Sequence, residues 1–229
     1  MIHFNYLIQN MPGITVIMID TGRNEEWFGI AKQSVLDQLY PLKLINAEKN
    51  EWAEQIELLI YPNRDKKLSI GACWNKLVKK AKYDHIFILD DDDKIVPMML
   101  FNLMFQLQTL RLDEKNKDII GVTPYVTFMS KHEGQTYHKI SHTYTSGLAE
   151  KEWLIKIPFR EDAKKHVDMR WDDDILKQNK YIALQRWNAG YMYRQHTDMV
   201  SGQNMHMRYI NDDLNRIIDI DIPYVSEGK

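Results

Sequence analysis

The sequence predicts an α/β protein built on a mainly parallel sheet, and two features of the chain support this prediction. Short uninterrupted runs rich in Val, Ile and Leu alternate with amphipathic segments of helical period through the first half. Such runs are typical of strands that are buried on both faces, as strands of parallel sheets are. Polar loops follow these runs, and ligands bind open α/β sheets at that position.

The first strand, helix and strand are expected between residues 14 and 60. Residues 14–19 (ITVIMI) form a β-branched apolar run. Asn24 and the two glutamates after it signal a helix start, because acidic side chains suit the positive end of a helix dipole. Apolar residues continue at helical spacing as far as Leu39, and Pro41 ends the pattern. Two further strand candidates follow, residues 42–45 and 56–60.

A second unit follows the same pattern. Ser69 is expected to cap a helix whose apolar face repeats with a period near 3.6 residues. That face consists of Ile70, Cys73, Trp74, Leu77, Val78 and Ala81. Residues 85–89 (HIFIL) form the next strand candidate, Pro97 begins a helix over residues 98–111, and residues 119–122 form another strand. The second half is less regular but contains no flexible linker, so we predict one domain over residues 1–229.

Composition excludes several classes of protein. The 229 residues carry a formal net charge of −2, which argues against a protein that coats nucleic acid by overall charge but leaves a local basic patch open. The single cysteine, Cys73, excludes an internal disulfide and a multi-cysteine zinc site, and it suits a reducing compartment. No signal-peptide pattern and no membrane-length apolar run occurs. We therefore expect a cytoplasmic protein without stable membrane insertion.

Four consecutive aspartates, residues 90–93, follow the strand candidate at residues 85–89. Two like charges about 4 Å apart repel by roughly 4 kcal/mol at an effective dielectric of about 20, so the run needs either water or a cation. If the extended backbone continues, Asp90 and Asp92 point to one face and Asp91 to the other. Two carboxylates on one face suit Mg²⁺ or Mn²⁺, with water and substrate phosphates in the remaining positions. A solvated turn remains the alternative.

The segment FILDDDDKIVP resembles the strand-end Asp-x-Asp motif of the GT-A glycosyltransferases, particularly family 2. ITVIMIDTGRNEEWFGIAKQSVLDQLYP is similar to the opening strand, loop and helix of that family, and SIGACWNKLVKKAKYDHIFILDDDD to the helix and strand before its metal motif. WDDDIL resembles the family's acidic Glu-Asp-x-x-Leu motif, and YRQHTDMVSG its late Tyr-x-Arg-x-His segment. These pieces occur in the family's order over residues 12–202. The resemblance implies a single GT-A domain, with a Rossmann-like sheet flanked by helices.

The resemblance also implies an activity. It indicates a hexosyl- or pentosyltransferase that uses Mn²⁺ or Mg²⁺ to move a sugar from a nucleotide diphosphate-sugar, with a UDP-sugar favoured, to an acceptor hydroxyl. Inversion with an aspartate as general base is expected. Residues 1–125 would form the nucleotide-sugar-binding half, and residues 126–229 the half that binds the acceptor and carries the base.

Site residues carry over one by one from the resemblance. Asp90 and Asp92 match the metal and diphosphate pair, and His196 an additional metal or diphosphate contact. Asp173 matches the base, with the register open among Asp172, Asp173 and Asp174. The expected nucleotide contacts are Thr21, Arg23, Glu48, Asp91 and Arg194. From the residues alone, Asp91 and Asp93 are expected to be solvated or to cap the following turn.

Several alternatives stay open. The WDDD segment is also typical of an ordinary helix N-terminus. The loop INAEKN, residues 45–50, has only Glu48 as an acid where the family's loop is Asp-rich, so the nucleobase is not fixed. The acceptor is a glycan, a lipid-linked sugar, a protein or a modified nucleic-acid base, as in viral DNA. A nucleotidyltransferase, a non-catalytic binder of nucleotides or carbohydrates, and a metal-free acidic structural protein are the competing functions.

Overall fold

The computed structural model describes residues 7, 10–39, 55–129, 136–139, 147–163, 167–194, 209–210 and 217–218. In chain order the elements are β1 (Ile14–Asp20), α2 (Glu25–Leu36), β2 (Ile56–Pro62), α3 (Ile70–Lys80), β3 (His85–Leu89), β4 (Lys94–Ile95), α4 (Met99–Leu110), a 3₁₀ turn (Glu114–Asn116), β5 (Ile119–Met129), β6 (Thr136–Lys139), β7 (Leu148–Glu150), α5 (Lys151–Lys156), α6 (Val167–Leu176), β8 (Tyr181–Arg194), β9 (Tyr209–Ile210) and β10 (Ile217–Ile218).

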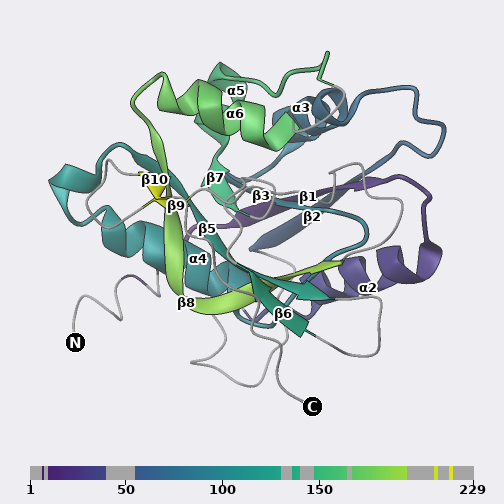
Figure 1. Cartoon of the computed structure of the whole chain (residues 1–229), viewed down its shortest axis with the longest axis horizontal. Coiled ribbons are helices and arrows are strands. Elements are labelled where there is room, and N and C mark those ends of the chain that lie inside the picture. The colour runs from purple at the N-terminus through teal and green to yellow at the C-terminus, as the bar shows by residue number, and fades with distance from the viewer. Residues whose placement is uncertain are drawn as a thin grey trace.

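An eight-stranded sheet with helices on both faces forms the centre of the molecule (Figure 1). The strand order is β2-β1-β3-β7-β5-β8-β4, and β6 pairs with β5 outside this path. β2, β1 and β3 are parallel, as are β5 and β8, whereas β7 and β4 run antiparallel to their neighbours. Most paired residues thus lie in parallel pairs, and the predicted α/β class is confirmed. The separate β9–β10 pair is antiparallel.

Two predicted helix starts, at Asn24 and Ser69, are confirmed by their caps. The Asn24 side chain accepts a hydrogen bond from the Trp27 backbone N–H at 3.0 Å, and Ser69 accepts from Ala72 at 3.2 Å. These bonds satisfy amide groups that the helices cannot pair internally. α2 ends at Leu36, before the predicted end at Leu39. The strand candidate at residues 42–45 lies outside the described residues.

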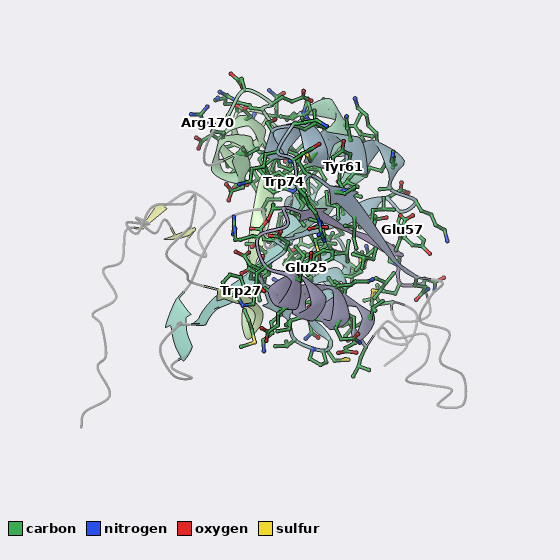
Figure 2. The ribbon with its side chains drawn as sticks, turned by 90° about the vertical axis from the view of Figure 1, so that its right-hand side faces the viewer. Glu25, Trp27, Glu57, Tyr61, Trp74 and Arg170 are labelled. Atoms are coloured by element: carbon green, nitrogen blue, oxygen red, sulfur yellow. The ribbon has the colours of Figure 1, made fainter. Side chains whose placement is uncertain are left out.

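Two apolar cores fill the space between the sheet and the helices. Ile14, Val16 and Met18 of β1 point to the face covered by α2 and α4. Ile17 and Ile19 point to the face covered by α3, α5 and α6. Figure 2 shows Trp74 on the inner side of α3, within this second core. β1 is therefore buried on both faces, as its uninterrupted apolar sequence predicted. Among the described helices, none is long and apolar enough to cross a membrane.

Candidate active site

Three polar loops meet at one edge of the sheet, because β1, β2 and β3 are parallel and end on the same side. The loop after β1 contains Asp20 to Arg23, the loop after β2 begins at Asn63, and the turn after β3 contains the four aspartates. The Asn63 backbone N–H donates to the Asp20 carbonyl at 2.9 Å and so joins the first two loops. The predicted position of the site, at the carboxyl ends of the strands, agrees with this arrangement.

The loop after β1 is held in one conformation by Asp20. Its carboxylate accepts from the Gly22 backbone N–H at 2.9 Å and from Arg64 Nε at 2.8 Å. Gly22 has a left-handed φ of 67°, and a Cβ at this position would lie 2.9 Å from Arg64 Cγ, so the turn requires glycine. Arg64 also bonds Glu25 at the start of α2, which Figure 2 labels. The loop conformation places Thr21 and Arg23 against the aspartates.

The four aspartates form a closed turn, not a continuation of the strand. β3 ends at Leu89, and the Asp93 backbone N–H bonds the Asp90 carbonyl at 3.3 Å. The predicted alternation of faces is therefore wrong, because the backbone reverses direction at Asp91 and Asp92. Both side chains bond the loop after β1. Asp91 accepts from the Thr21 backbone N–H at 2.8 Å and from its hydroxyl, and Asp92 accepts from Arg23 Nη1 at 2.6 Å.

The expectation that Asp91 and Asp93 are solvated is also wrong. Asp91 is 7% exposed and Asp93 only 1% exposed. Asp93 accepts a hydrogen bond from the Tyr191 hydroxyl at 2.7 Å, across 98 positions of sequence. A buried carboxylate needs such partners, since an unpaired one would cost several kcal/mol or more. The second half of the chain therefore supports the acidic turn from inside the protein.

Negative charge accumulates at Asp90. Its pKa is raised well above the usual value, first by withdrawal from solvent and then by the charges of Asp92, Asp91 and Asp168, while Arg23 acts in the opposite direction. Burial also raises the pKa of Asp91, although its hydrogen bonds from Thr21 oppose the shift. Both raised pKa values mean that the site disfavours an ionised carboxylate whose charge is not compensated. A bound cation would relieve this repulsion.

The donor set fits a hard divalent cation that is shared with a substrate. Asp90 and Asp92 supply only carboxylate oxygens, which Mg²⁺ and Mn²⁺ prefer. Across the described ranges, no group of three or more His, Cys, Asp or Glu side chains is arranged to hold a metal. A cation at this turn would therefore take its other ligands from water and substrate phosphates, as Mg²⁺ commonly does.

The structure leaves three predicted site residues without a described side chain. Glu48 and His196 lie outside the described residues. Arg194 is the last residue of β8, and its backbone is paired with Met129 of β5, but its side chain is among those not described. The roles predicted for these residues remain predictions.

α6 carries the predicted base segment. The helix begins at Val167, so WDDD lies inside it, and the alternative that this segment is the helix N-terminus is wrong. Asp174 is bound by Arg160 at 2.8 and 2.7 Å and by Lys177 at 2.7 Å. Asp173 is exposed and Asp172 is half-buried. Because Trp171 is buried between Phe159 and the sheet, Asp173 lies on the opposite, solvent side of the helix.

Asp168 is the residue of α6 whose charge reaches Asp90. Residues one helical turn apart share a face, so Asp172 lies on the same side of α6 as Asp168. The charge of Asp168 therefore acts on the acidic turn, and Asp172 shares the side of α6 that carries Asp168. Periodicity could have identified Asp168 in the sequence, since it stands four positions before Asp172.

α6 is anchored to α3 by the segment that precedes it. Asn75 of α3 donates to the Phe159 carbonyl at 2.9 Å and accepts from the Phe159 N–H at 2.9 Å. The Trp171 indole N–H donates to the Ile157 carbonyl at 2.6 Å. Phe159 packs between Trp74 and Trp171, with ring centroids 4.9 and 5.6 Å away. The face of α6 near Asp90 is thus fixed by packing and by paired backbone groups.

Besides Asp168, sequence reasoning missed three contributors to the site. Asp20 and Arg64 organise the loop after β1, and Tyr191 supports the acidic turn. The position of Asp20 at a strand end was a usable signal, since polar residues there face the ligand edge. No local pattern marks Arg64 or Tyr191, because their partners are distant in the sequence.

Comparisons with known proteins identify a structural likeness. No protein-family model matches the chain, and no curated protein matches it either. S. aureus TarS 1-349 in complex with UDP-GlcNAc is similar, with a TM-score of 0.56 and 15% identity over 82% of this chain and 60% of that one. The complex of the same protein with UDP has a TM-score of 0.56 and 16% identity over 80% of this chain and 60% of that one.

A further structure of S. aureus TarS has a TM-score of 0.54 and 13% identity, over 80% of this chain and 37% of that one. The chain thus spans less than two thirds of the length of the structures it matches. The likeness confirms the predicted GT-A fold. At this level of identity it shows the fold alone.

Proposed function

We propose that this chain is a metal-dependent glycosyltransferase that moves a sugar from a nucleotide diphosphate-sugar, first of all a UDP-sugar, to an acceptor hydroxyl. The observation that carries the proposal is the acidic turn packed against Thr21 and Arg23 at the carboxyl edge of the sheet. The likeness to a protein crystallised with UDP-GlcNAc and with UDP supports the choice of donor.

Asp90 and Asp92 would hold the cation in this proposal. Bound there, Mn²⁺ or Mg²⁺ would neutralise the charge that a nucleoside diphosphate gains as it leaves. Thr21 orients Asp91 by two hydrogen bonds, which keeps the backbone of the turn in place. Arg23 supplies a guanidinium at the same edge, and guanidinium groups bind phosphate oxygens in pairs.

The general base in this proposal is a carboxylate of α6. Displacement with inversion needs a group opposite the leaving diphosphate that takes the acceptor's proton. Asp174 forms ion pairs with Arg160 and Lys177. The remaining candidates are Asp172 and Asp173, the position that the sequence motif favours. We favour Asp172, because it shares the face of Asp168, whose charge reaches Asp90.

The acceptor and the compartment stay predictions from the sequence. A glycan, a lipid-linked sugar, a protein and a nucleic-acid base all present hydroxyls or can be modified to do so. A cytoplasmic location remains our expectation from the single cysteine. The match covers 60% of the TarS 1-349 chain, and the acceptor therefore stays a proposal.

A thermal-shift panel of nucleoside diphosphates, their sugars and nucleoside triphosphates, with and without Mn²⁺, tests the function. A ligand at 100 times its dissociation constant stabilises the native state by about 2.7 kcal/mol. We expect UDP or a UDP-sugar to raise the melting temperature only when Mn²⁺ is present, and the Asp90→Asn variant to lose the shift. Stabilisation by nucleoside triphosphates alone would favour a nucleotidyltransferase, and a panel without any shift would contradict the proposal.

A further inference from the structure

Arg23 contacts one of the two carboxylates that are proposed to hold the cation. Its Nη1 lies 2.6 Å from Asp92 Oδ2, and the two side chains are 31% and 11% exposed. The Arg23 side chain and a divalent cation would therefore meet at the same carboxylate. Since the guanidinium stays protonated under all working conditions, it cannot yield the position by losing its charge.

The backbone is held by hydrogen bonds on both sides of this contact, so the fold itself positions the pair. Arg23 stands between Gly22, whose N–H is bonded to Asp20, and Asn24, which caps α2. Asp92 belongs to the turn closed between Asp90 and Asp93. Neither backbone segment has to move for the side chain of Arg23 to swing between Asp92 and a phosphate next to it.

We infer that Arg23 and the divalent cation compete for Asp92, and that the diphosphate of the donor resolves this competition by accepting the guanidinium. A diphosphate offers Arg23 paired oxygen acceptors, which suit the guanidinium fork better than one carboxylate oxygen. Asp92 then becomes available to the cation in the same event. The protein then binds the cation weakly when no diphosphate is present and tightly when a diphosphate binds with it. This inference rests on the proposed function and adds an order of binding to it.

A simpler explanation is that Arg23 only adds positive charge to the edge of the sheet. Lys67 separates the two explanations, because it lies in the loop after β2 at the same edge but bonds Asp65, not Asp92. Removal of either cationic side chain changes the net charge equally. Only removal of Arg23 takes away the guanidinium that bonds Asp92.

The experiment measures free Mn²⁺ by electron paramagnetic resonance during titration of the full chain, first without nucleotide and then with UDP. The proteins are wild type, Arg23→Gln, Arg23→Lys and Lys67→Gln, each checked for folding by circular dichroism. Arg23→Gln is expected to bind Mn²⁺ alone at least about fivefold more tightly than wild type, the change that loss of an ion pair near 1 kcal/mol produces. Lys67→Gln is expected to change this affinity less than about twofold, and Arg23→Lys to stay close to wild type.

UDP affinity at saturating Mn²⁺ provides the second measurement, and it is expected to fall in Arg23→Gln, so the two affinities move in opposite directions. If Arg23→Gln binds Mn²⁺ alone no more tightly than wild type, or only as tightly as Lys67→Gln does, the inference is overturned while the proposed function stands. If wild type retains no Mn²⁺ even with UDP, both fall. Arg23→Met, which keeps the apolar stem, replaces Arg23→Gln in both measurements if that variant does not fold.

Discussion

His85 is a buried histidine at the start of β3, 7% exposed, and neither ring nitrogen has a hydrogen-bond partner in the part of the chain that the structure describes. Burial, with the nearby positive charge of Arg111, lowers its pKa from 6.5 to about 4, and Asp84 only partly opposes the shift. The native state therefore keeps this imidazole neutral at a pH where the unfolded chain takes up a proton.

This shift predicts a loss of stability in mild acid. The contribution of neutral His85 is fully present above pH 6.5 and is lost as the pH falls toward about 4. Each pH unit in this window removes up to about 1.4 kcal/mol of the free energy of unfolding. Urea unfolding of wild type and His85→Leu at pH 7.5, 6 and 5 measures this loss of unfolding free energy. The variant should lose less stability than wild type on acidification, and an equal loss would contradict the assigned pKa.

The two candidate bases on α6 can be distinguished by substitution. Asp172→Asn should lower the rate of sugar transfer by about 10²–10⁴-fold, because proton removal from the acceptor is lost. Binding of UDP with Mn²⁺ should stay unchanged, since α6 would contact the acceptor and not the diphosphate. Asp173→Asn is the matched control, exposed on the solvent side of the same helix.

The measurement is the initial rate of UDP release from the donor that the thermal-shift panel identifies. Either the acceptor or water serves as the attacking group. A large loss in Asp173→Asn with a normal rate in Asp172→Asn would return the base to the position that the sequence motif favours. Equal and small effects in both would remove α6 from the chemistry.

Strand β8 supports the acidic turn through Tyr191. Its ring packs near Phe87 at a centroid distance of 6.4 Å, and its hydroxyl donates to Asp93 at 2.7 Å. Burial and the charges of Asp93 and Asp90 raise the pKa of Tyr191 well above its usual value, so the phenol stays a hydrogen-bond donor. The turn that presents Asp90 and Asp92 is thereby joined to an element from the far half of the chain.

Tyr191→Phe keeps the ring and removes this donor. The variant should lose about 1–3 kcal/mol of unfolding free energy, because a buried carboxylate then has one partner fewer. It should also bind UDP with Mn²⁺ more weakly, since the turn is less rigid. Tyr181→Phe, at the other end of β8, is the control. Guanidinium unfolding and a UDP titration would reveal no difference between the two variants if Tyr191 acts only through its ring.

At the scale of the whole molecule, the sequence predicted the elements that local rules determine. β1, β3 and α3 were predicted close to their observed bounds, because apolar periodicity and the Ser69 cap act over a few residues. The same rules placed the site at the carboxyl edge. The overall sheet order required contacts between distant strands, such as β7 between β3 and β5, which no local pattern encodes.

The geometry of the site was less predictable for the same reason. The alternation expected for the aspartates failed because a turn, closed by Asp93 and supported by Tyr191, replaces the strand. The position of α6 was not predicted, because Val167 and Trp171 join an apolar core that also contains residues of α3, and the acidic run does not encode this packing. Residue types identified the candidate ligands, and tertiary contacts decided where they point.

The proposed function depends on a cation that is shared by Asp90, Asp92 and a nucleoside diphosphate. Its most direct test is a crystal of the protein grown with Mn²⁺ and UDP, with anomalous diffraction recorded at the manganese edge. We predict an anomalous peak within about 2.0–2.3 Å of oxygens from both carboxylates and the diphosphate. Bound UDP with no manganese peak at the turn, or with a peak bound by other residues, would contradict the account.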